Sequence, residues 1–253
     1  MTDETTPPGP PGAPTLPRYL QLLWGREPEG RRGPRPARTI EEIGAAAVEI
    51  ADREGLDAVS MKSVASAVGF TTMSLYRYVD SRDELGAVML DVALGAPDLH
   101  FTRAQGWRER ITAWTRRLSQ RRMAHPWTVE VHQAAPPLTP NAIEWMERGL
   151  EALEGADLTS QQRLSSMLAI DGWNQHHVRQ SVQMGLVGAR DAEGPPGDYL
   201  QQIGVLVDAE RFPRLVSAGP EALDDEGDFF DEEFEHGLTL LLDGIEALIA
   251  RSR

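Results

Sequence analysis

The sequence predicts an all-helical protein, and three observations lead to this fold class. Beyond residue 38, apolar side chains recur at intervals of three and four residues, which is the period of an amphipathic helix. No segment shows the sustained alternation of apolar and polar residues that is typical of a half-buried strand. Capping residues and glycines stand where these periodic segments begin and end.

The first 38 residues differ in composition from the rest of the chain. Half of the 18 prolines lie here, which excludes a long helix or a central strand. We expect a flexible arm over residues 1–38, with a turn or two of helix at 16–24. The arm ends in an arginine cluster without an intervening acid: Arg31, Arg32, Arg35 and Arg38. By itself, this cluster could be a solvated linker.

Four helices are predicted between residues 39 and 97. Thr39 and Glu42 form a capping-box pattern, and Gly55 is a natural stop for the helix that Thr39 begins. A second helix starts at Ser60 and ends at Gly69. The third spans 71–79, and the fourth starts near residue 81 and ends by 95–97.

Further helices are predicted in the remaining 156 residues. We expect helices at 106–124, 141–153, 159–184, 199–210 and 229–250. A short helix should carry Trp127, Val131 and His132 between flanking prolines. Residues 188–197 have the composition of a loop.

Residues 60–79 have the pattern of a helix-turn-helix. Gly69 permits the positive φ of a tight turn between two short helices. On the second helix, Leu75 and Val79 should face the core. The opposite face then carries side chains that can contact base edges, thymine methyls and phosphates. These are Thr72, Met73, Tyr76 and Arg77.

At this point the chain resembles the tetracycline-repressor-like (TetR) family of bacterial transcription regulators. The resemblance to its DNA-binding domain covers residues 39–85. It rests on AAVEIA at 46–51, SMKSVA at 60–65, VGF at 68–70, SLYRYV at 74–79 and SRDEL at 81–85. The segments HPW at 125–127 and FEHGLTLLLDGIE at 234–246 resemble, more loosely, the C-terminal domain of tetracycline-repressor type.

The resemblance implies DNA contacts. Tyr76 and Tyr78 match positions that contact the DNA backbone or brace the recognition helix. Each candidate could instead be a solvated polar side chain, and many family members have Gly or Lys where this chain has Thr71 and Thr72. The full set of candidates is Thr39, Lys62, Thr71, Thr72, Met73, Ser74, Tyr76, Arg77, Tyr78 and Arg82. In this context the arginine cluster is a candidate minor-groove arm.

The segment 100–187 contains five of the six tryptophans. Any one of them is best explained by ordinary core packing, but together, amid short proline-broken helices, they favour an apolar, aromatic small-molecule cavity. The effector would then be hydrophobic or aromatic. Asn174 and His177 lie three residues apart, so both can face inward on one helix. The candidate ligand contacts are Trp107, Trp114, Trp127, Val131, His132, Trp145, Met146, Trp173, Asn174 and His177.

The last predicted helix carries a broad apolar stripe that should pair with a second copy of the chain. Its members are Phe234, Leu238, Leu241, Leu242, Ile245 and Leu248. The resemblance implies a four-helix dimer interface built with the helix at 159–184. Such a dimer supplies two recognition helices for a palindromic operator.

We therefore expect an arm at 1–38, a DNA-binding domain at 39–85 with a connecting helix to about 95, and a ligand-binding and dimerisation domain at 96–253. The leading hypothesis is a homodimeric repressor that a small molecule releases from its operator. One alternative is a helical ligand-binding module that has lost DNA binding. Another is a metal-dependent enzyme using Asp171, His176 and His177. We expect no catalysis, metal or cofactor.

Composition sets the remaining limits. The chain has no cysteine, which excludes disulfides and zinc-thiolate sites. It has no membrane-length apolar run and no signal peptide, so we expect a cytoplasmic protein. Taken alone, the net charge of -14 argues against a nucleic-acid partner. Most of this charge lies beyond residue 95, however, so an acidic body can suppress non-specific binding while local basic groups contact DNA.

Overall fold

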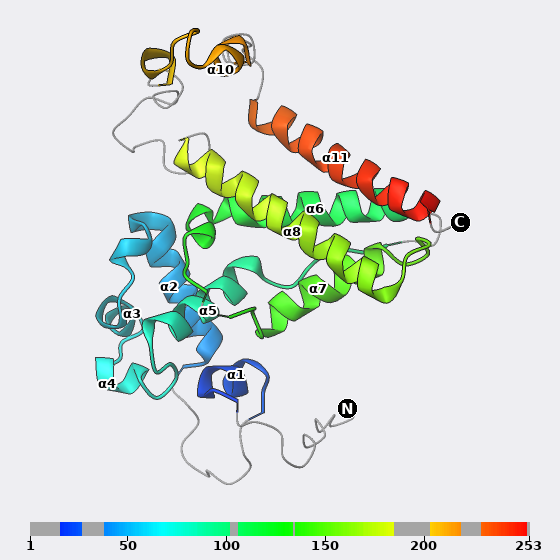
Figure 1. The fold of residues 1–253 in the computed structure, drawn as a ribbon. Coiled ribbons are helices and arrows are strands. Elements are labelled where there is room, and N and C mark those ends of the chain that lie inside the picture. Colours follow the sequence, from blue (N-terminus) through cyan, green and yellow to red (C-terminus); the bar gives the residue numbers. More distant parts are fainter. Residues whose placement is uncertain are drawn as a thin grey trace. The chain divides into compact units, whose positions relative to one another are not determined.

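The computed structural model describes residues 16–26, 38–101, 106–133, 135–184, 203–218 and 229–251. Within these ranges all regular structure is helical, which confirms the predicted fold class (Figure 1). The elements are α1 (Arg18–Leu23), α2 (Ile40–Glu54), η1 (Leu56–Ala58), α3 (Met61–Ala67), α4 (Thr72–Leu75), α5 (Arg82–Leu94), α6 (Trp107–Ala124), η2 (Pro126–Val129), α7 (Pro140–Ala152), α8 (Ser160–Gln183), α10 (Pro213–Ala218) and α11 (Phe229–Arg251).

The chain divides into two compact units. Met1–Pro97 and Glu130–Met146 form the first unit, and Asp98–Val129 and Glu147–Arg253 form the second. Residues 130–146 thus return to the N-terminal unit. Helix α7 begins in the first unit and continues into the second.

The first unit is built on α2 and α5. The predicted capping box of α2 is present: the Thr39 hydroxyl accepts from the Glu42 N–H at 3.2 Å, and Glu42 Oε2 accepts from the Thr39 N–H at 2.8 Å. The helix ends at Gly55, whose φ is 85°. Gly44 allows α2 to lie close to α5, because a Cβ there would come within 2.8 Å of Val92 Cγ2.

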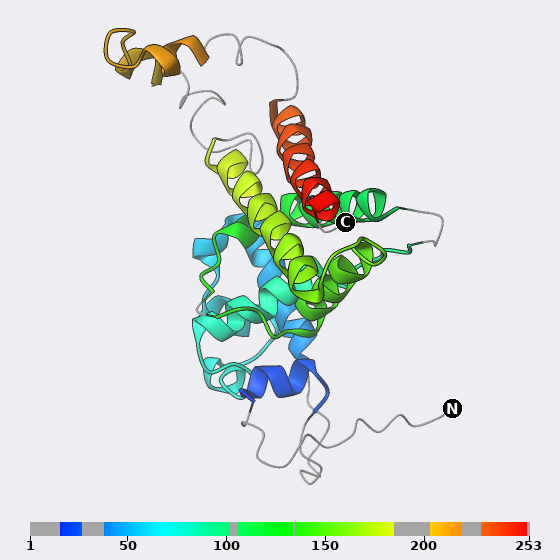
Figure 2. The same ribbon diagram turned by 45° about the vertical axis from the view of Figure 1, so that its right-hand side comes forward.

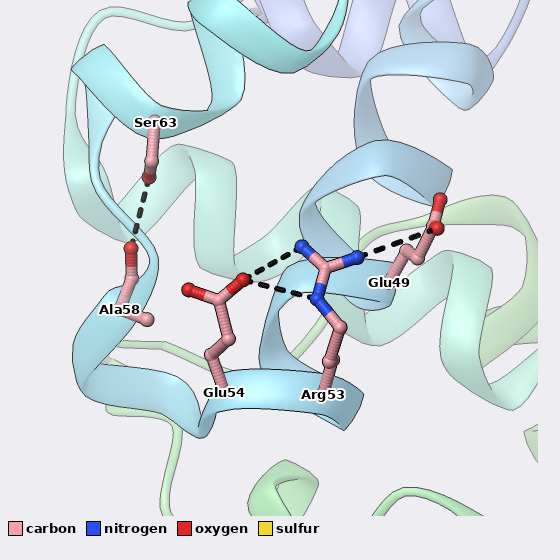
Figure 3. A network of polar contacts seen from close by, with 5 residues as sticks. All are labelled: Glu49, Arg53, Glu54, Ala58 and Ser63. Carbon is pink, nitrogen blue, oxygen red and sulfur yellow. Dashed lines mark hydrogen bonds and ion pairs between the residues drawn. The ribbon is translucent and has the colours of Figure 1, made fainter.

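The junction between α2 and α3 is a short polar network (Figure 3). Arg53, in the last turn of α2, contacts Glu54 at 2.6 Å and Glu49 at 3.7 Å. Ser63 Oγ donates to the Ala58 carbonyl at 2.9 Å, which ties α3 back to η1. The ion pairs are exposed and therefore contribute little stability, whereas the serine bond orients the start of α3.

Part of the segment expected to be a flexible arm is ordered. As predicted for 16–24, Arg18–Leu23 is helical, and its Leu20 is buried. The helix packs on α2, and the Trp24 indole N–H donates to the Leu138 carbonyl at 2.8 Å. Burial of an apolar side chain and this long-range bond explain the order. Arg31, Arg32 and Arg35 lie outside the described residues.

Helices α5 and α7 are joined through Asp91, a buried acid of α5. Asp91 Oδ1 accepts from the Asn141 N–H at 2.8 Å, and Asn141 Nδ2 donates to the Asp91 carbonyl at 2.9 Å. The Trp145 indole donates to the Gly95 carbonyl at 2.9 Å, one turn further along both helices. Asp91 therefore satisfies N–H groups at the start of α7 from another helix. Burial raises the pKa of this carboxyl above its ordinary value.

The second unit is formed by α6, η2, α8, α11 and the end of α7. Thr159 caps α8 through a complete capping box, as predicted. Figures 1 and 2 show α8 and α11 side by side, and Gly237 of α11 lies against the Trp173 ring, where a Cβ would come within 2.6 Å of Nε1. Arg108 of α6 contacts Asp243 of α11 at 2.6 Å.

Three expectations from the sequence are corrected in the region beyond residue 125. The short helix with Trp127 is only the 3-10 turn Pro126–Val129, and Val131 and His132 lie outside it in the first unit. The helical residues before 207 end at 206 and not at 210, while residues 199–202 lie outside the described part. A separate helix, Pro213–Ala218, follows because proline fits the first turn of a helix.

The apolar stripe of α11 is mostly buried within its own chain. Phe234, Leu238, Leu242 and Ile245 are buried, whereas Leu241 and Leu248 are half-buried. The sequence shows the stripe but not what covers it. Here α11 packs on α8 of the same chain and is ion-paired with α6.

The raised pKa of Asp91 generates a prediction about pH. The folded-state pKa of Asp91 lies above its ordinary value of 3.8. Asp91 therefore adds to the free energy of unfolding at pH values below 3.8, and this contribution is lost as the pH rises through the raised pKa. The stability of the parent relative to Asp91→Asn should therefore fall as the pH rises, in urea unfolding of both proteins from pH 3.5 to 7.

The control is Asp98, a carboxyl whose pKa is shifted in the opposite direction. The hydrogen bond from Arg117 lowers the pKa of Asp98, so the stability of the parent relative to Asp98→Asn should rise slightly over the same pH range. Equal pH slopes for the two variants would contradict the explanation by burial.

Candidate nucleic-acid interface and interior polar cluster

Local hydrogen bonds set the helix-turn-helix. Ser60 begins α3 with a capping box that includes Ser63. The turn that follows contains Gly69 at a φ of 75°, which confirms the predicted positive φ, and the Phe70 N–H donates to the Ala65 carbonyl at 2.7 Å. Thr71 then caps α4, accepting from the Ser74 N–H at 3.2 Å.

The regular part of α4 is shorter than the predicted helix at 71–79. It spans Thr72–Leu75, and residues 76–78 form a turn. The backbone hydrogen bonds there span three residues, as in a 3-10 helix. The Arg77 N–H donates to the Ser74 carbonyl at 3.3 Å, and the Tyr78 N–H donates to the Leu75 carbonyl at 2.9 Å. Leu75 and Val79 are fully buried, as expected.

The face of α4 opposite Leu75 is exposed. The side chain of Met73 is 76% exposed and that of Tyr76 is 42% exposed, although both are large and partly apolar. Arg77 and Lys62 are also exposed. These side chains are therefore accessible to a partner that approaches α4. Thr72 and Ser74 are half-buried, and Thr71 is exposed.

Tyr78 is placed as a brace. Its side chain is buried, its hydroxyl donates to the Arg38 carbonyl at 3.1 Å, and its ring stacks on Phe70 at 5.9 Å between centroids. Of the two roles implied for this position, the geometry favours bracing over direct contact. Tyr78 thereby holds the residue before Thr39, the N-cap of α2.

The remaining basic candidates lie at the ends of helices. Arg38 is exposed and lies 3.6 Å from Glu42. Arg82, in the first turn of α5, reaches the Leu56 carbonyl at 3.5 Å. Both contacts are weak and exposed, so a phosphate can replace them at little cost.

A cluster of buried polar side chains lies in the second unit. Arg122 of α6 donates to Asn174 Oδ1 at 2.5 Å and to Asp171 Oδ1 at 2.7 Å. Arg122 and Asn174 are both buried. An aromatic group adjoins them on α8 and α11: the Trp173 ring lies 5.7 Å from His177 and 5.2 Å from Phe234, between centroids.

The structure divides the predicted ligand contacts between the two units. Trp107, Trp114, Trp127, Trp173, Asn174 and His177 belong to the second unit, and Val131, His132, Trp145 and Met146 to the first. His132 is exposed, and the indole N–H of Trp145 donates a hydrogen bond to the Gly95 carbonyl. As expected, Asn174 and His177 are both buried on α8.

Sequence reasoning missed three buried polar residues on α6 and η2: Ser119, Arg122 and Thr128. A signal exists for Arg122, because it continues the apolar register of Leu118 on α6. Ser119, next to Leu118, and Thr128 carry no distinctive signal. Their burial depends on the packing of η2 against α6 and α8.

The residues considered for a metal site do not converge. Asp171 is paired with Arg122, His176 is exposed and His177 is buried. Among the residues described, no group of three acids or histidines is arranged to hold a metal ion. Nor does any helix in the described ranges have both the length and the apolarity needed to cross a bilayer.

Comparison with known proteins places both regions in one family. Residues 43–87 match the model of bacterial regulatory proteins of the tetR family, and residues 102–249 match the tetracyclin repressor-like C-terminal domain. The HTH-type transcriptional repressor DrrR1 of Streptomyces coeruleorubidus is 34% identical over 251 residues, covering 96% of this chain and 90% of the relative. An HTH-type transcriptional regulator of Saccharopolyspora erythraea is 29% identical, covering 89% and 91%.

Solved structures show the same architecture. Apo ActR from Streptomyces coelicolor superposes with a TM-score of 0.70 at 25% identity, covering 87% of this chain and 100% of ActR. ActR in complex with actinorhodin gives a TM-score of 0.67 at 27% identity, covering 84% and 97%. With the family models matched in both regions and a relative aligned over nearly the whole chain, this protein belongs to the TetR family of bacterial transcriptional regulators.

Proposed function

We propose that the protein is a homodimeric repressor that binds a palindromic operator through α3 and α4 and is released by a small aromatic effector. The observation that carries the proposal is the contrast between the two faces of α4. Leu75 is fully buried, whereas Met73 and Tyr76 project into solvent. The curated relative DrrR1 is named as a repressor, and ActR has been solved with actinorhodin.

On the operator, each exposed residue has a distinct role. Met73 would contact thymine methyls, and the Tyr76 hydroxyl a phosphate or a base edge. Lys62, Arg77 and Arg82 would contact phosphates. Thr71, Thr72 and Ser74 would lie at the DNA end of α4, where free N–H groups also favour a phosphate.

The N-terminal arm would add contacts in an adjacent minor groove. Arg38 and Thr39 stand at the start of α2, held from behind by the Tyr78 hydroxyl. Arg31, Arg32 and Arg35 precede them in the sequence. Arginine suits narrow, A·T-rich grooves because their negative potential is strong.

The dimer would form through the exposed faces of α8 and α11. Leu168 of α8 is 49% exposed and Leu240 of α11 is 61% exposed. Gly172 and Gly244 are exposed on the same helices, and an added Cβ would meet no described atom within 4 Å. Small residues beside exposed leucines suit close helix packing in a four-helix interface. Leu241 and Leu248 would border it.

The effector would bind inside the second unit and change the separation of the two recognition helices. The two operator half-sites lie at a fixed spacing, so a small change in the separation of the two recognition helices is enough to weaken binding. The loss of DNA affinity equals the coupling free energy between the two sites. Helix α7 is a candidate connection, because it begins in the first unit at the Asp91 junction and continues into the second.

Operator binding provides the first test. Arg77→Ala should weaken binding about tenfold per half-site at low salt, because each half-site loses one charge-assisted contact. The slope of log K against log salt should fall by about one per recognition helix. Fluorescence anisotropy with the DNA upstream of the protein's own gene measures both values.

The matched control is Arg251→Ala, which removes an exposed arginine at the end of α11. Its operator affinity and salt slope should equal those of the parent. If Arg77→Ala behaves like this control, α4 does not contact phosphate through Arg77. If the parent selects no sequence from a random DNA pool, the protein is a binding module without operator recognition.

The dimer has its own test. Leu240→Glu places a charge at the centre of the proposed interface, so the protein should sediment as a monomer and lose at least tenfold in operator affinity. The control, Leu206→Glu, alters a leucine that is more exposed but lies outside α8 and α11. A dimeric Leu240→Glu protein would rule out this interface.

A further inference from the structure

We propose that Met73 is a site of reversible oxidation and that its sulfoxide weakens operator binding. The inference rests on the proposed function, because it assigns a chemical modification to the face of α4 that would read the operator. The side chain of Met73 is 76% exposed. A sulfur atom in this position is open both to DNA and to a dissolved oxidant.

Met73 differs in exposure from every other methionine of the described residues. Met89 and Met167 are each 1% exposed. The others are half-buried: Met61, Met123, Met146 and Met184. An oxidant must reach the sulfur to react with it, so the exposed side chain should react first. The sequence contains no cysteine, so no thiolate of this protein competes for the oxidant.

The backbone beneath Met73 is held by contacts in which its side chain takes no part. Leu75 anchors α4 and is fully buried. The Thr71 hydroxyl accepts a hydrogen bond from the Ser74 N–H at 3.2 Å and so caps the helix. An oxygen added to the Met73 sulfur should therefore change the exposed face of α4 without unfolding the helix.

The reaction is a two-electron oxidation by a peroxide. With hydrogen peroxide, the sulfur lone pair attacks one peroxide oxygen, an S–O bond forms, the O–O bond breaks, and water leaves. The sulfur is oxidised and the peroxide is reduced. In the return reaction, which methionine sulfoxide reductases catalyse, a dithiol is oxidised to a disulfide, the thioether is restored and water is released.

Oxidation changes what Met73 offers to a base pair. The thioether is largely apolar and suits the methyl group of thymine. The sulfoxide is polar, and its oxygen can only accept hydrogen bonds, so contact with a methyl group would bury this oxygen without a partner. The expected loss of operator affinity is about fivefold or more per half-site.

Peptide masses after graded exposure to hydrogen peroxide locate the modification. Trypsin cleaves after Lys62 and Arg77, so Met73 is the only methionine in peptide 63–77, and Met61 lies in the peptide before it. Peptide 63–77 should gain one oxygen before any peptide that carries another described methionine. Operator DNA should slow this gain because it would cover the face of α4, whereas the same amount of non-operator DNA should not.

Operator binding measures the consequence. After peroxide treatment the parent should lose about fivefold or more in affinity per half-site, and methionine sulfoxide reductases with dithiothreitol should restore the affinity. Met73→Leu has no sulfur here, so its own affinity should be the same before and after treatment. Met73→Gln, which is polar without any oxidant, should bind more weakly than Met73→Leu. The matched control, Met61→Leu, keeps Met73 and should respond to peroxide as the parent does.

The inference is overturned by any one of several results. Another described methionine gains oxygen first, operator DNA does not slow the oxidation of Met73, oxidised Met73 leaves the affinity unchanged, or Met73→Leu loses affinity as the parent does. If the untreated parent binds operator and one of these results is obtained, only the modification is refuted. An untreated parent that binds no operator refutes the repressor function and this inference together.

Discussion

The packing of α2 on α5 is the constraint on which the DNA-binding surface depends. Gly44 lets the two helices approach until Val88 and Val92 lie against the α2 backbone. This core supports α3 and α4, each too short to be stable by itself. Leu75 and Val79 anchor α4, and Tyr78 connects its end to the start of α2. The exposed side of α4 is held firmly because its opposite side is buried.

The same first unit also contains the start of α7. Asp91 is retained in a buried position although burial disfavours its charge, because its oxygens satisfy N–H groups that would otherwise be unpaired. Helix α7 thus begins at a buried polar junction of the first unit and continues into the second.

The second unit combines apolar packing with an incomplete polar interior. Trp173 packs into the gap left by Gly237, which brings α8 and α11 together. Between α6 and α8, Arg122 and Asn174 form a polar contact that is neutralised by Asp171.

The sequence alone determined the features whose causes lie within a few residues. Helix starts at Thr39, Ser60 and Thr159 and the turn at Gly69 could be read directly, because capping bonds and a positive φ join close neighbours. The buried face of α4 followed from helical spacing, and so did the inward position of Asn174.

Only the tertiary structure decided which groups meet across the chain. It placed Phe234 and Leu238 inside their own chain, brought Asp91 to the start of α7, and paired the Asn174 oxygen with Arg122 of α6. Helical periodicity shows that a face is apolar, but it does not show which surface covers that face. Side-chain partners fifty residues away depend on how helices pack, and that arrangement is a property of the whole fold.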